Sequence, residues 1–428
     1  MNAVTATTDT APANPNDYDV TIVGAGPVGM ALAGWLARRS ATAALRVALI
    51  DAREPDDSAG DPRAIAVSQG SRTLLEALAW PRDATAIERI HVSQRGHFGR
   101  TLIDRNDYGL AALGYVARYG AIVQSLAHAV RETSVHWLHH TEARDPLVEH
   151  DGVTLSLVSA GVERRLRTRV LVNAEGGLYR PGSAQAAEAE PPTHDDTIPD
   201  AQNASVHAKD EKKRTRDYGQ TALVGVVTVS APQPHVAWER FTNEGPIALL
   251  PMGGVRGADY ALVWCCAPHE AARRAQLPDA DFLAELDRAF GSRMGRFTQI
   301  RTRASFPLGL SALDALVTGH GRIAAVGNAA QRLHPVAGQG LNLGLRDAHA
   351  LAEALAQYGA TPLALAAFGR QRAVDRRLTI GATDTLARLF TVDFGPFAAL
   401  RGLALTALEF APPVKTALAR QMMFGQRT

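Results

Sequence analysis

The chain has 428 residues, of which 46% are hydrophobic and 21% are charged, and its formal net charge at pH 7 is +2. This length and apolar content are sufficient for two or three domains with hydrophobic cores. Because the net charge is small and no basic cluster alternates with aromatic residues, the composition argues against a nucleic-acid partner.

The cysteines and the N-terminal residues bear on where the protein works. Cys265 and Cys266 are adjacent in a predicted strand, so their side chains point to opposite faces and are expected to form neither a disulfide nor a metal site. Residues 1–17 lack the basic and apolar segments of a signal peptide and are expected to be a flexible tail. Together these features predict a cytoplasmic protein without a bound metal.

The first predicted unit is a strand, a glycine turn, a helix and a second strand. Tyr18–Val23 is an apolar run typical of a buried strand, and the sequence GAGPVG follows it at once. A helix is predicted over Met30–Arg39 and a strand over Arg46–Ile50, which ends at Asp51. This order, with an acid placed to accept hydrogen bonds from a ribose, predicts a dinucleotide-binding unit.

The residues of the glycine turn have separate predicted roles. Gly24 permits the tight turn, Gly26 lets a pyrophosphate approach the backbone, and Gly29 allows close packing of the helix. The predicted cradle consists of Gly24, Gly26, Pro27, Val28 and Gly29. Because NAD and FAD are both bound by such a turn, this motif does not distinguish between them.

Four further segments precede the predicted second domain. Asp61–Val67 (DPRAIAV) leads into an amphipathic stretch, and Leu113–Leu126 (LGYVARYGAIVQSL) is typical of a strand followed by a helix. Arg169–Gly176 (RVLVNAEG) is typical of a buried strand that ends in an acid and a glycine. Residues 183–217 are polar and rich in alanine and charge, which predicts a solvated loop insertion.

From Thr221 the pattern changes to short apolar strands separated by Pro and Gly, which predicts an antiparallel sheet. The predicted strands are Ala222–Val229, His235–Phe241, Ile247–Pro251 and Tyr260–Cys266. A helix is expected over Asp281–Phe290, after which Arg301–Leu308 leads back to the first domain. Four large side chains on or beside these strands could line a ligand pocket or, more simply, fill the core: Trp238, Phe241, Met252 and Trp264.

The most informative segment is Arg322–Asp347 (RIAAVGNAAQRLHPVAGQGLNLGLRD). Ile323–Val326 is typical of a buried strand, and Gly327 ends it where the backbone must come close to a ligand. A loop rich in Pro and Gly, His334–Gly340, then leads into a helix predicted over Leu341–Leu355. The unpaired N–H groups and the dipole at the N-terminus of such a helix favour negative charge.

The C-terminal residues 361–428 are expected to be helical, and Phe390–Phe424 is unusually apolar. The best candidate for a membrane span, Phe397–Val414, is interrupted by Arg401 and Glu409, so no span is predicted. Two interpretations of this apolar region stay open. The simpler one is helices that pack on their own domain, and the other is a surface for a membrane or a partner protein.

Several segments together resemble the FAD-dependent hydroxylases of bacterial ubiquinone biosynthesis, of the 2-octaprenyl-6-methoxyphenol hydroxylase-like kind, within the para-hydroxybenzoate hydroxylase-type flavin monooxygenases. The segments that carry this resemblance are Arg89–Gly99, Leu110–Val116, Trp238–Met252, Leu262–Cys265 and Gly327–Ala348. The resemblance covers nearly the whole chain outside the N-terminal tail and the polar insertion.

The fold implied by this resemblance is α/β, with a Rossmann-like FAD-binding domain, an inserted antiparallel-sheet substrate domain and C-terminal helices. The FAD-binding domain is expected to cover residues 18–182 and 309–360, with an excursion to the substrate side near residues 85–115. The substrate domain is expected over residues 218–308, and the C-terminal helices follow from residue 361.

The resemblance also implies that the cofactor is FAD and which residues bind it. Beyond the first glycine turn and Asp51, the implied FAD-binding residues are Arg63, Arg118, Glu175, Gly176, Gly327, Asn328, Gly338, Gln339, Gly340, Leu341 and Asn342. Tyr119 and Gln124 are further candidates. Pro335 is expected next to the reactive edge of the flavin. His334 is a candidate proton partner there, although a loop histidine with a satisfied hydrogen bond is the simpler interpretation.

Three positions depart from the family pattern. Asn328 stands where most members have Asp, and it keeps a carbonyl oxygen for the ribityl hydroxyls without a formal charge near the pyrophosphate. Glu175 stands where Asp is usual, and Tyr179 where Ser is usual. Because this second motif is thought to serve both FAD and the nicotinamide donor, NAD(P)H is a candidate electron donor whose direct use is in question.

The implied activity is the hydroxylation of a polyprenylated phenol by O2 in ubiquinone biosynthesis, through a flavin hydroperoxide. Two alternatives stay open: a hydroxylase of a soluble aromatic that uses NADPH directly, and a flavin-bearing scaffold subunit of a quinone-biosynthesis complex. The implied surroundings are other ubiquinone-biosynthesis proteins and the inner face of the cytoplasmic membrane, contacted peripherally. A homodimer is compatible with the sequence.

Overall fold

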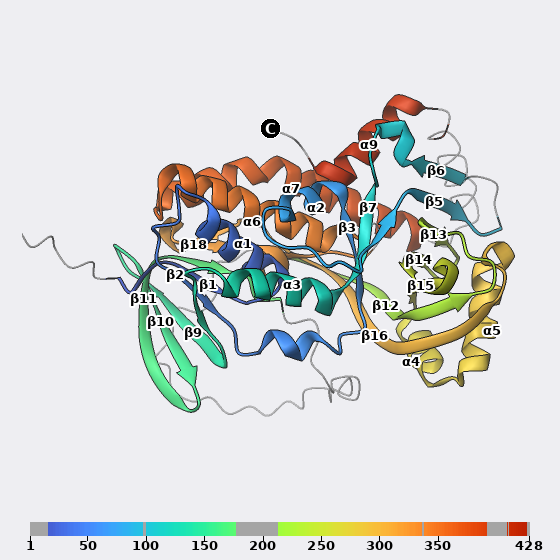
Figure 1. Cartoon of the computed structure of the whole chain (residues 1–428), viewed down its shortest axis with the longest axis horizontal. Helices are drawn as coiled ribbons and strands as arrows, with labels where there is room; N and C mark the ends of the chain where they lie inside the picture. The colour runs from blue at the N-terminus through green and yellow to red at the C-terminus, as the bar shows by residue number, and fades with distance from the viewer. Residues whose placement is uncertain are drawn as a thin grey trace, which may run out of the picture.

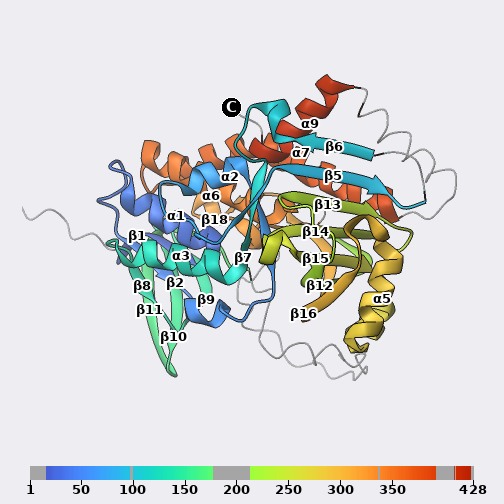
Figure 2. The ribbon, with the colours of Figure 1, turned by 45° about the vertical axis from the view of Figure 1, so that its right-hand side comes forward.

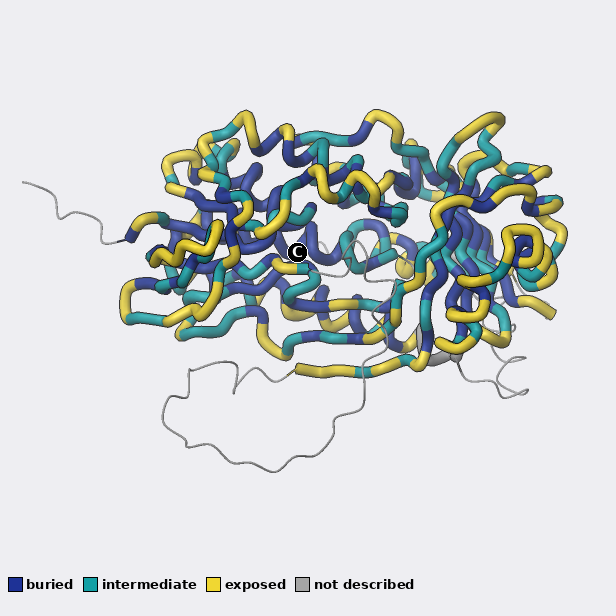
Figure 3. Tube along the Cα trace, turned by 90° about the horizontal axis from the view of Figure 1, so that it is seen from below, coloured by how far each residue is buried: buried dark blue, intermediate teal, exposed yellow. Residues whose placement is uncertain are grey.

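The structure, a computed structural model, describes residues 16–96, 100–176, 213–335, 338–391, 409 and 411–425. These residues form two regions that lie side by side along the long axis of the molecule (Figure 1). One region is built on a parallel sheet covered by helices, and the other on a large, mainly antiparallel sheet. Buried residues run through both regions, whereas exposed residues gather on the outer loops (Figure 3). The expected α/β fold is therefore confirmed.

The N-terminal unit forms the centre of the parallel sheet. β1 (Tyr18–Val23) pairs in parallel with β2 (Val47–Ile50) on one side and with β11 (Val162–Asn173) on the other. β18 (Ile323–Ala325) continues the sheet beyond β11, also in parallel. The two outer strands are β8 (His136–Leu138) and β17 (Val317–Thr318). Because parallel strands end at one edge, the segments that follow β1, β2, β11 and β18 lie close together.

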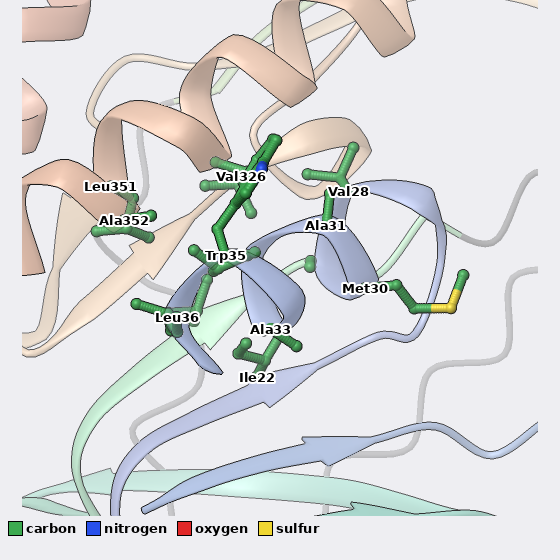
Figure 4. Packing of buried hydrophobic residues seen from close by; sticks show 14 of the residues in the cluster. Ile22, Val28, Met30, Ala31, Ala33, Trp35, Leu36, Val326, Leu351 and Ala352 are labelled. Carbon is green, nitrogen blue, oxygen red and sulfur yellow. The ribbon is translucent and has the colours of Figure 1, made fainter. Parts of the chain in front are cut away.

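Helices cover one face of this sheet and a hairpin covers part of the other. α1 (Pro27–Arg38) is buried from Pro27 to Leu36, because it lies between the sheet and α6 (Gln339–Tyr358), with Ile22 of β1 below it and Leu351 of α6 beside it (Figure 4). α3 (Tyr119–Arg131) packs next to α1. The hairpin of β9 (Thr141–Val148) and β10 (Val153–Ser159) pairs with β11 and packs leucine side chains against Ile50.

The second region is an eight-stranded sheet whose strands come from three separate parts of the chain. In spatial order they are β19 (Gln331–Arg332), β16 (Phe297–Leu313), β12 (Lys213–Val229), β15 (Asp259–Cys266), β14 (Pro246–Gly253), β13 (Val236–Phe241), β5 (Arg89–Gln94) and β6 (Arg100–Asp104). All neighbours pair antiparallel except β13 and β5, which run parallel (Figure 2). The sheet is therefore antiparallel, as expected, except for one parallel pair. Residues near 85–115 contribute strands to it, also as expected.

β12 begins earlier than the sequence predicts. Lys213–Asp217, expected to belong to the polar insertion 183–217, form the start of this strand and pair with β16. Arg214 and Arg216 form ion pairs of 2.9 and 3.1 Å with Asp384 of α7 (Pro362–Thr391). A buried carboxylate therefore stabilises a charged segment as a strand, which moves the start of the sheet region from residue 218 to residue 213. The rest of the predicted insertion lies outside the described residues.

One face of the large sheet is covered by α4 (Pro268–Gln276) and α5 (Asp279–Phe290). Trp238 and Trp264 are buried on that face, where their rings meet phenylalanine rings edge to face. Both tryptophans fill the core of this region, and Trp238 is also among the residues that line the cavity described below. The opposite face of the sheet is turned toward the parallel-sheet region. A small sheet joins the two regions, and its strands are β3 (Ala64–Ser68), β7 (Gly114–Arg118) and β4 (Thr85–Ile87).

The C-terminal helix α9 (Pro412–Phe424) packs against α2 (Gln69–Leu75), next to β5 and β6 (Figure 2). Met423 is buried there, and a Cβ added at Gly70 would lie 2.6 Å from its carbonyl oxygen. The described part of the apolar C-terminal region therefore packs on its own domain, whereas residues 392–408 lie outside the described residues. In the part of the chain that the structure describes, no helix is long and apolar enough to cross a membrane.

A buried ionic network joins α6 to α7. Its members are Gln331, Arg346, Asp347, Arg372, Asp375 and Arg376, all of them buried. Asp347 accepts hydrogen bonds from Nε of Arg372 at 2.7 Å and from Nε2 of Gln331 at 2.8 Å. Asp375 accepts from Nη2 of Arg372 at 2.5 Å and from Nε of Arg346 at 3.1 Å. The network fixes the orientation of α6, whose N-terminus borders the site described next.

Candidate functional site

The ends of β1, β2, β11 and β18 open onto a cavity of about 1140 Å³. It extends from the glycine turn after β1 to the face of the large sheet that α4 and α5 leave uncovered. Pockets that hold one drug-sized ligand usually measure roughly 300 to 1000 Å³. This cavity is therefore larger than a pocket for one drug-sized ligand.

The glycine turn has the geometry that its sequence predicts. Gly24 has a φ of +106°, and its N–H donates to the carbonyl oxygen of Ile50 at 2.8 Å, a backbone conformation that favours glycine. A Cβ added at Gly29 would collide with the carbonyl oxygen of Gly24. At Gly26 a Cβ would meet only the hydroxyl of Tyr119, at 3.8 Å. Gly24 and Gly29 thus shape the turn, and Gly26 leaves space for a ligand beside the N-terminus of α1.

The second glycine segment approaches the same cavity from the other side. Gly327 follows β18 with a φ of +62°, and a Cβ at Gly344 would lie 2.9 Å from its Cα, so α6 packs tightly on this turn. Gly338 caps α6 with a φ of +59°. Gly340 and Leu341, in the first turn of α6, line the cavity, and a Cβ at Gly340 would have no neighbour within 4 Å. The cavity is therefore bordered by two helix N-termini, which attract negative charge.

Polar groups at the edge of the parallel sheet complete this side of the cavity. Asp51 follows β2, and its two carboxylate oxygens accept from the N–H groups of Ala25 at 2.7 Å and Arg53 at 2.9 Å. The Nδ2 atom of Asn328 donates to the carbonyl oxygen of Gly176 at 3.4 Å, which ties the segment after β18 to the segment after β11. All the strand ends that the two motifs predict to meet at a ligand do meet here.

Glu175 lies beside Asp51 in the cavity wall. Desolvation raises the pKa of Glu175, the carboxylates of Asp51 and Glu142 raise it further, and Arg53 lowers it. The neighbouring carboxylates would repel a diphosphate from this end of the cavity. The N-termini of α1 and α6 are the better place for such a group.

Arg63 lies in the cavity wall with its guanidinium already paired. It donates to Asp61 from Nε at 2.9 Å and from Nη2 at 2.5 Å. Its guanidinium carbon lies 4.3 Å from the centre of the Tyr119 ring. A bidentate ion pair and an aromatic face hold the group in place, so a ligand in the cavity meets a fixed positive charge.

His334 is almost completely buried beside the cavity, with 2% of its surface exposed. Its Nε2 atom lies 3.3 Å from Oε1 of Gln220, and its ring meets the ring of Tyr218 edge to face. Burial lowers the pKa of His334 to about 4, so the imidazole is neutral at pH 7. These contacts fit a histidine with a satisfied hydrogen bond. The neighbouring Pro335 lines the cavity.

Replacing His334 with glutamine is expected to reduce the acid sensitivity of folding. The pKa is about 4 in the folded protein and 6.5 in its ordinary state. Below pH 6.5 the unfolded chain therefore binds a proton that the folded protein does not bind, and stability falls until the pH reaches about 4. From these two pKa values, the free energy of unfolding is expected to fall by about 2 kcal/mol between pH 7.5 and pH 5. Urea unfolding should show a correspondingly smaller loss for His334→Gln, and an equal loss in both proteins would contradict this account.

Two of the residues implied to bind FAD hold the loop before α6 instead of lining the cavity. Nε2 of Gln339 donates to the carbonyl oxygen of Met422 in α9 at 3.3 Å. Oδ1 of Asn342 accepts from the N–H of Ser68 at 2.8 Å, and its Nδ2 donates to the carbonyl oxygen of Gly338 at 2.7 Å. Neither residue is in the cavity wall, and their side chains stabilise the loop and helix that border it. A backbone contact of either residue with FAD stays a prediction.

Other sequence candidates are placed as follows. Gly29 packs beneath the turn and Arg118 is exposed at the end of β7, so neither lines the cavity. Gln124 donates to Asp56 at 2.8 Å, outside the cavity wall, whereas Tyr119 lies in it. Tyr179 lies outside the described residues. The remaining predicted residues line the cavity, and they are Gly24, Gly26, Pro27, Val28, Asp51, Arg63, Glu175, Gly176, Gly327, Asn328, His334, Pro335, Gly338, Gly340 and Leu341.

The large sheet contributes a mainly apolar wall to the cavity, with the carboxyl group of Glu239 among its apolar side chains. The wall includes Val224, Ala248, Leu250 and Val263, and Glu239 lies among them. Sequence reasoning missed Glu239 because a single strand does not reveal which of its faces borders a cavity. A signal was available in the sequence. Ala237 lies two residues before Glu239 and so on the same face of the strand, which marks Glu239 as a charged residue beside an apolar position.

The arrangement fits FAD. The open space beside Gly26 and Gly340, at two helix N-termini, suits a diphosphate. Asp51 is placed to accept hydrogen bonds from a ribose, and the apolar wall suits an aromatic ring system. Among the described residues no cluster of His, Cys, Asp or Glu could hold a metal ion.

Comparisons with known proteins agree with this reading of the cavity. A family model described as an FAD binding domain matches residues 17–364. Ubiquinone hydroxylase UbiL of Rhodospirillum rubrum is 32% identical over 427 residues, which cover 95% of this chain and 89% of that protein. The ubiquinone biosynthesis monooxygenase COQ6 of Xenopus tropicalis is 27% identical over 459 residues, which cover 94% of this chain and 92% of that protein.

A solved structure shares the fold. The p-nitrophenol 4-monooxygenase PnpA from Pseudomonas putida matches with a TM-score of 0.71 over 96% of this chain and 99% of its own, at 15% sequence identity.

Proposed function

Because the chain belongs to the FAD-binding domain family and is an FAD-dependent monooxygenase, we propose that it hydroxylates a polyprenylated phenol in ubiquinone biosynthesis. The names of the two ubiquinone-pathway relatives support the pathway. The observation that carries the choice of substrate is the apolar wall of the cavity, which would receive a phenol ring and the start of a hydrocarbon tail. A soluble aromatic acid would instead meet the carboxyl group of Glu239, which repels its charge when ionised.

The same geometry supports roles for the residues that would hold the cofactor. Gly26 and the first turn of α1 would receive the diphosphate, Asp51 would accept from a ribose hydroxyl, and Gly340 would let the ring system approach the N-terminus of α6. FAD, when bound, supplies the activation of O2. The chain itself must hold the phenol, exclude water and manage the phenolic proton.

Mass spectrometry of quinone lipids from cells that lack the gene, compared with cells that carry it back, tests this function. We expect a polyprenylphenol one oxygen short of the normal intermediate to accumulate, and ubiquinone to be lost, because the ring cannot be hydroxylated. Ubiquinone must return when the cells carry the wild-type gene again. Normal ubiquinone would contradict the proposal, and loss of ubiquinone without this intermediate would favour a scaffold role.

We propose that NAD(P)H is the electron donor. The rate at which NAD(P)H reduces the bound flavin without oxygen tests this choice directly. Fast reduction by NADPH alone that is stimulated by a small soluble phenol would favour the soluble-aromatic alternative.

Peripheral contact with the membrane that holds the lipid substrate is a further part of the proposal. Three large apolar side chains are exposed on β6 and α9, with 37% of Leu102, 60% of Val414 and 39% of Leu418 accessible. The N–H of Leu102 donates to Glu409 at 3.2 Å, so β6 lies near the start of this helix. Apolar side chains gathered at one place on a surface can enter the interface of a bilayer.

The double replacement Val414→Ser and Leu418→Ser is expected to lower co-flotation with phospholipid vesicles several-fold while FAD content stays the same. Val255→Ser is the matched control, because Val255 is 84% exposed in the turn between β14 and β15. Unchanged flotation of the double variant would show that this surface does not bind the vesicles.

A further inference from the structure

Glu239 lies within the apolar wall of the cavity, near the centre of β13. It pairs with Ala248 of β14 on one side and with Val92 of β5 on the other. Because side chains alternate along a strand, Trp238 points to the opposite face, into the core under α5. The carboxyl group is therefore carried by a rigid, central strand with its face toward the cavity, where Glu239 is one of the lining residues.

The carboxyl group of Glu239 lacks the partners that a buried acid normally has. None of the described residues forms a hydrogen bond or an ion pair with it. The nearest positions across the strands are Ala248 and Val92, which offer no donor. Glu239 is partly buried and lines the cavity, and an acid in this position without a protein partner suggests a ligand that supplies the hydrogen bond.

The surroundings set the proton affinity of this group. Desolvation alone raises the pKa of Glu239 to about 7. Burial, and then the nearby Glu239, raise the pKa of the Cys265 thiol, so this neighbour stays protonated. On this face of the sheet the other charged groups are Asp217, Asp259, which is paired with Arg301, and Arg216, which is paired with Asp384. Across the cavity lie Arg63, which is paired with Asp61, Tyr119, Arg332 and His334, which is neutral. The far end of the cavity is lined by Asp51, Arg53, Glu54, Asp57, Glu142 and Glu175.

We propose that Glu239 is the general base of the reaction and accepts the proton of the phenol that is to be hydroxylated. The inference rests on the proposed function, because it requires a phenol in the cavity. In the step, the O–H bond of the phenol breaks, a new O–H bond forms at a carboxylate oxygen of Glu239, and no electrons leave either group. The product is a phenolate, whose ring is the better nucleophile toward an oxygen donor.

The partly buried position of Glu239 in an apolar wall suits this proton transfer in two ways. An ordinary phenol has a pKa of about 10 and an ordinary glutamate about 4.3, so transfer between them is uphill by almost six powers of ten. With the pKa of Glu239 at about 7, the difference falls to about three powers of ten. The transfer also moves one negative charge from carboxylate to phenolate without adding a charge to the apolar wall, so it requires no new counter-ion.

The test compares the holoenzyme with its Glu239→Gln and Glu239→Asp variants, using a short-chain 2-prenylphenol as the probe. Wild-type kcat should rise through a pKa near 7 as Glu239 loses its proton. In Glu239→Gln we expect kcat to fall by about 10² to 10⁴-fold and this pH dependence to vanish. KM should change by less than about tenfold, and FAD content and Tm should stay the same. Glu239→Asp keeps the carboxylate and should recover part of the rate.

Glu88→Gln is the matched control, because Glu88 lies just before β5, outside the cavity wall, and pairs with Arg105. It should leave both the rate and the pH profile unchanged. A Glu239→Gln variant with the kcat and the pH profile of the wild type would overturn the proposal.

A binding experiment separates failure of this inference from failure of the proposed function. The oxidised holoenzyme is titrated with the same prenylphenol and with its methyl ether, which has no proton to donate, and binding is followed by flavin absorbance. Wild-type protein should bind the phenol at least about tenfold more tightly than the ether above pH 7, and Glu239→Gln should lose most of this preference. Preference without any product would contradict the hydroxylase and leave Glu239 as the proton acceptor. Equal preference in the variant would overturn the role of Glu239 alone.

Discussion

Replacing Gly26 with valine will give a folded protein that contains little or no FAD. Gly26 has φ −72° and ψ 178°, an extended conformation that valine adopts without strain. A Cβ there meets only the Tyr119 hydroxyl, at 3.8 Å, so the side chain fits the fold. It would nevertheless fill the space that the diphosphate of the cofactor needs. We expect FAD affinity to fall at least about 100-fold, measured as flavin released per chain after denaturation.

Two other glycines serve as controls for this prediction. Gly29→Ala collides with the Gly24 carbonyl and should prevent correct folding, so it loses FAD together with its thermal transition. Gly60→Val should keep both, because a Cβ at Gly60 has no neighbour within 4 Å and the residue lies outside the cavity wall. Full FAD occupancy in Gly26→Val would show that the diphosphate lies elsewhere.

Replacing Asp347 with asparagine is expected to cost about 3 to 5 kcal/mol of folding stability. In the network between α6 and α7, the buried guanidinium groups of Arg346 and Arg372 pair with two buried carboxylates. Removal of the Asp347 charge leaves Arg372 with Asp375 alone, which Arg346 also uses. A buried, uncompensated cation is then left in a site that water cannot reach.

Thermal unfolding measures this effect, and we expect the Tm to fall by about 3 to 6 °C. The matched control is Asp151→Asn, because its partner Arg167 lies at the surface and also pairs with Glu149. Loss of an exposed pair should cost less than about 1 kcal/mol. Similar losses in the two variants would mean that the buried network contributes no more than surface charge does. Because α6 carries Gly340 and Leu341, FAD retention in Asp347→Asn should fall as well.

The parts of the fold that follow from local sequence could be predicted. β1, the glycine turn and α1 are set by an apolar run, by residues that permit a tight turn and by helical periodicity, all within a short stretch. The same holds for β18, Gly327 and α6. Since parallel strands end at one edge, the two motifs could also be placed together, and the cavity confirms that they meet there.

The rest depends on partners that are distant in sequence. Lys213–Asp217 has the composition of a loop, but Asp384 supplies the charge that lets it form a strand. The side-chain amide of Asn342 joins β3 to the start of α6, a contact with residues far away in the sequence. Glu239 is an ordinary acid in one strand until the pairing of β13 shows which face borders the cavity.

The parallel pairing of β13 with β5 means that the two regions are interleaved along the chain. β5 and β6 leave the parallel-sheet region, join the large sheet, and are followed by β8 and β11 of the parallel sheet. A polypeptide cut between β11 and β12 would yield two fragments, each with an incomplete version of both sheets. Such fragments should fold only when mixed, and an intact chain must close long loops before either sheet is complete, which slows folding. Neither sheet can therefore be transferred to another protein as one continuous segment.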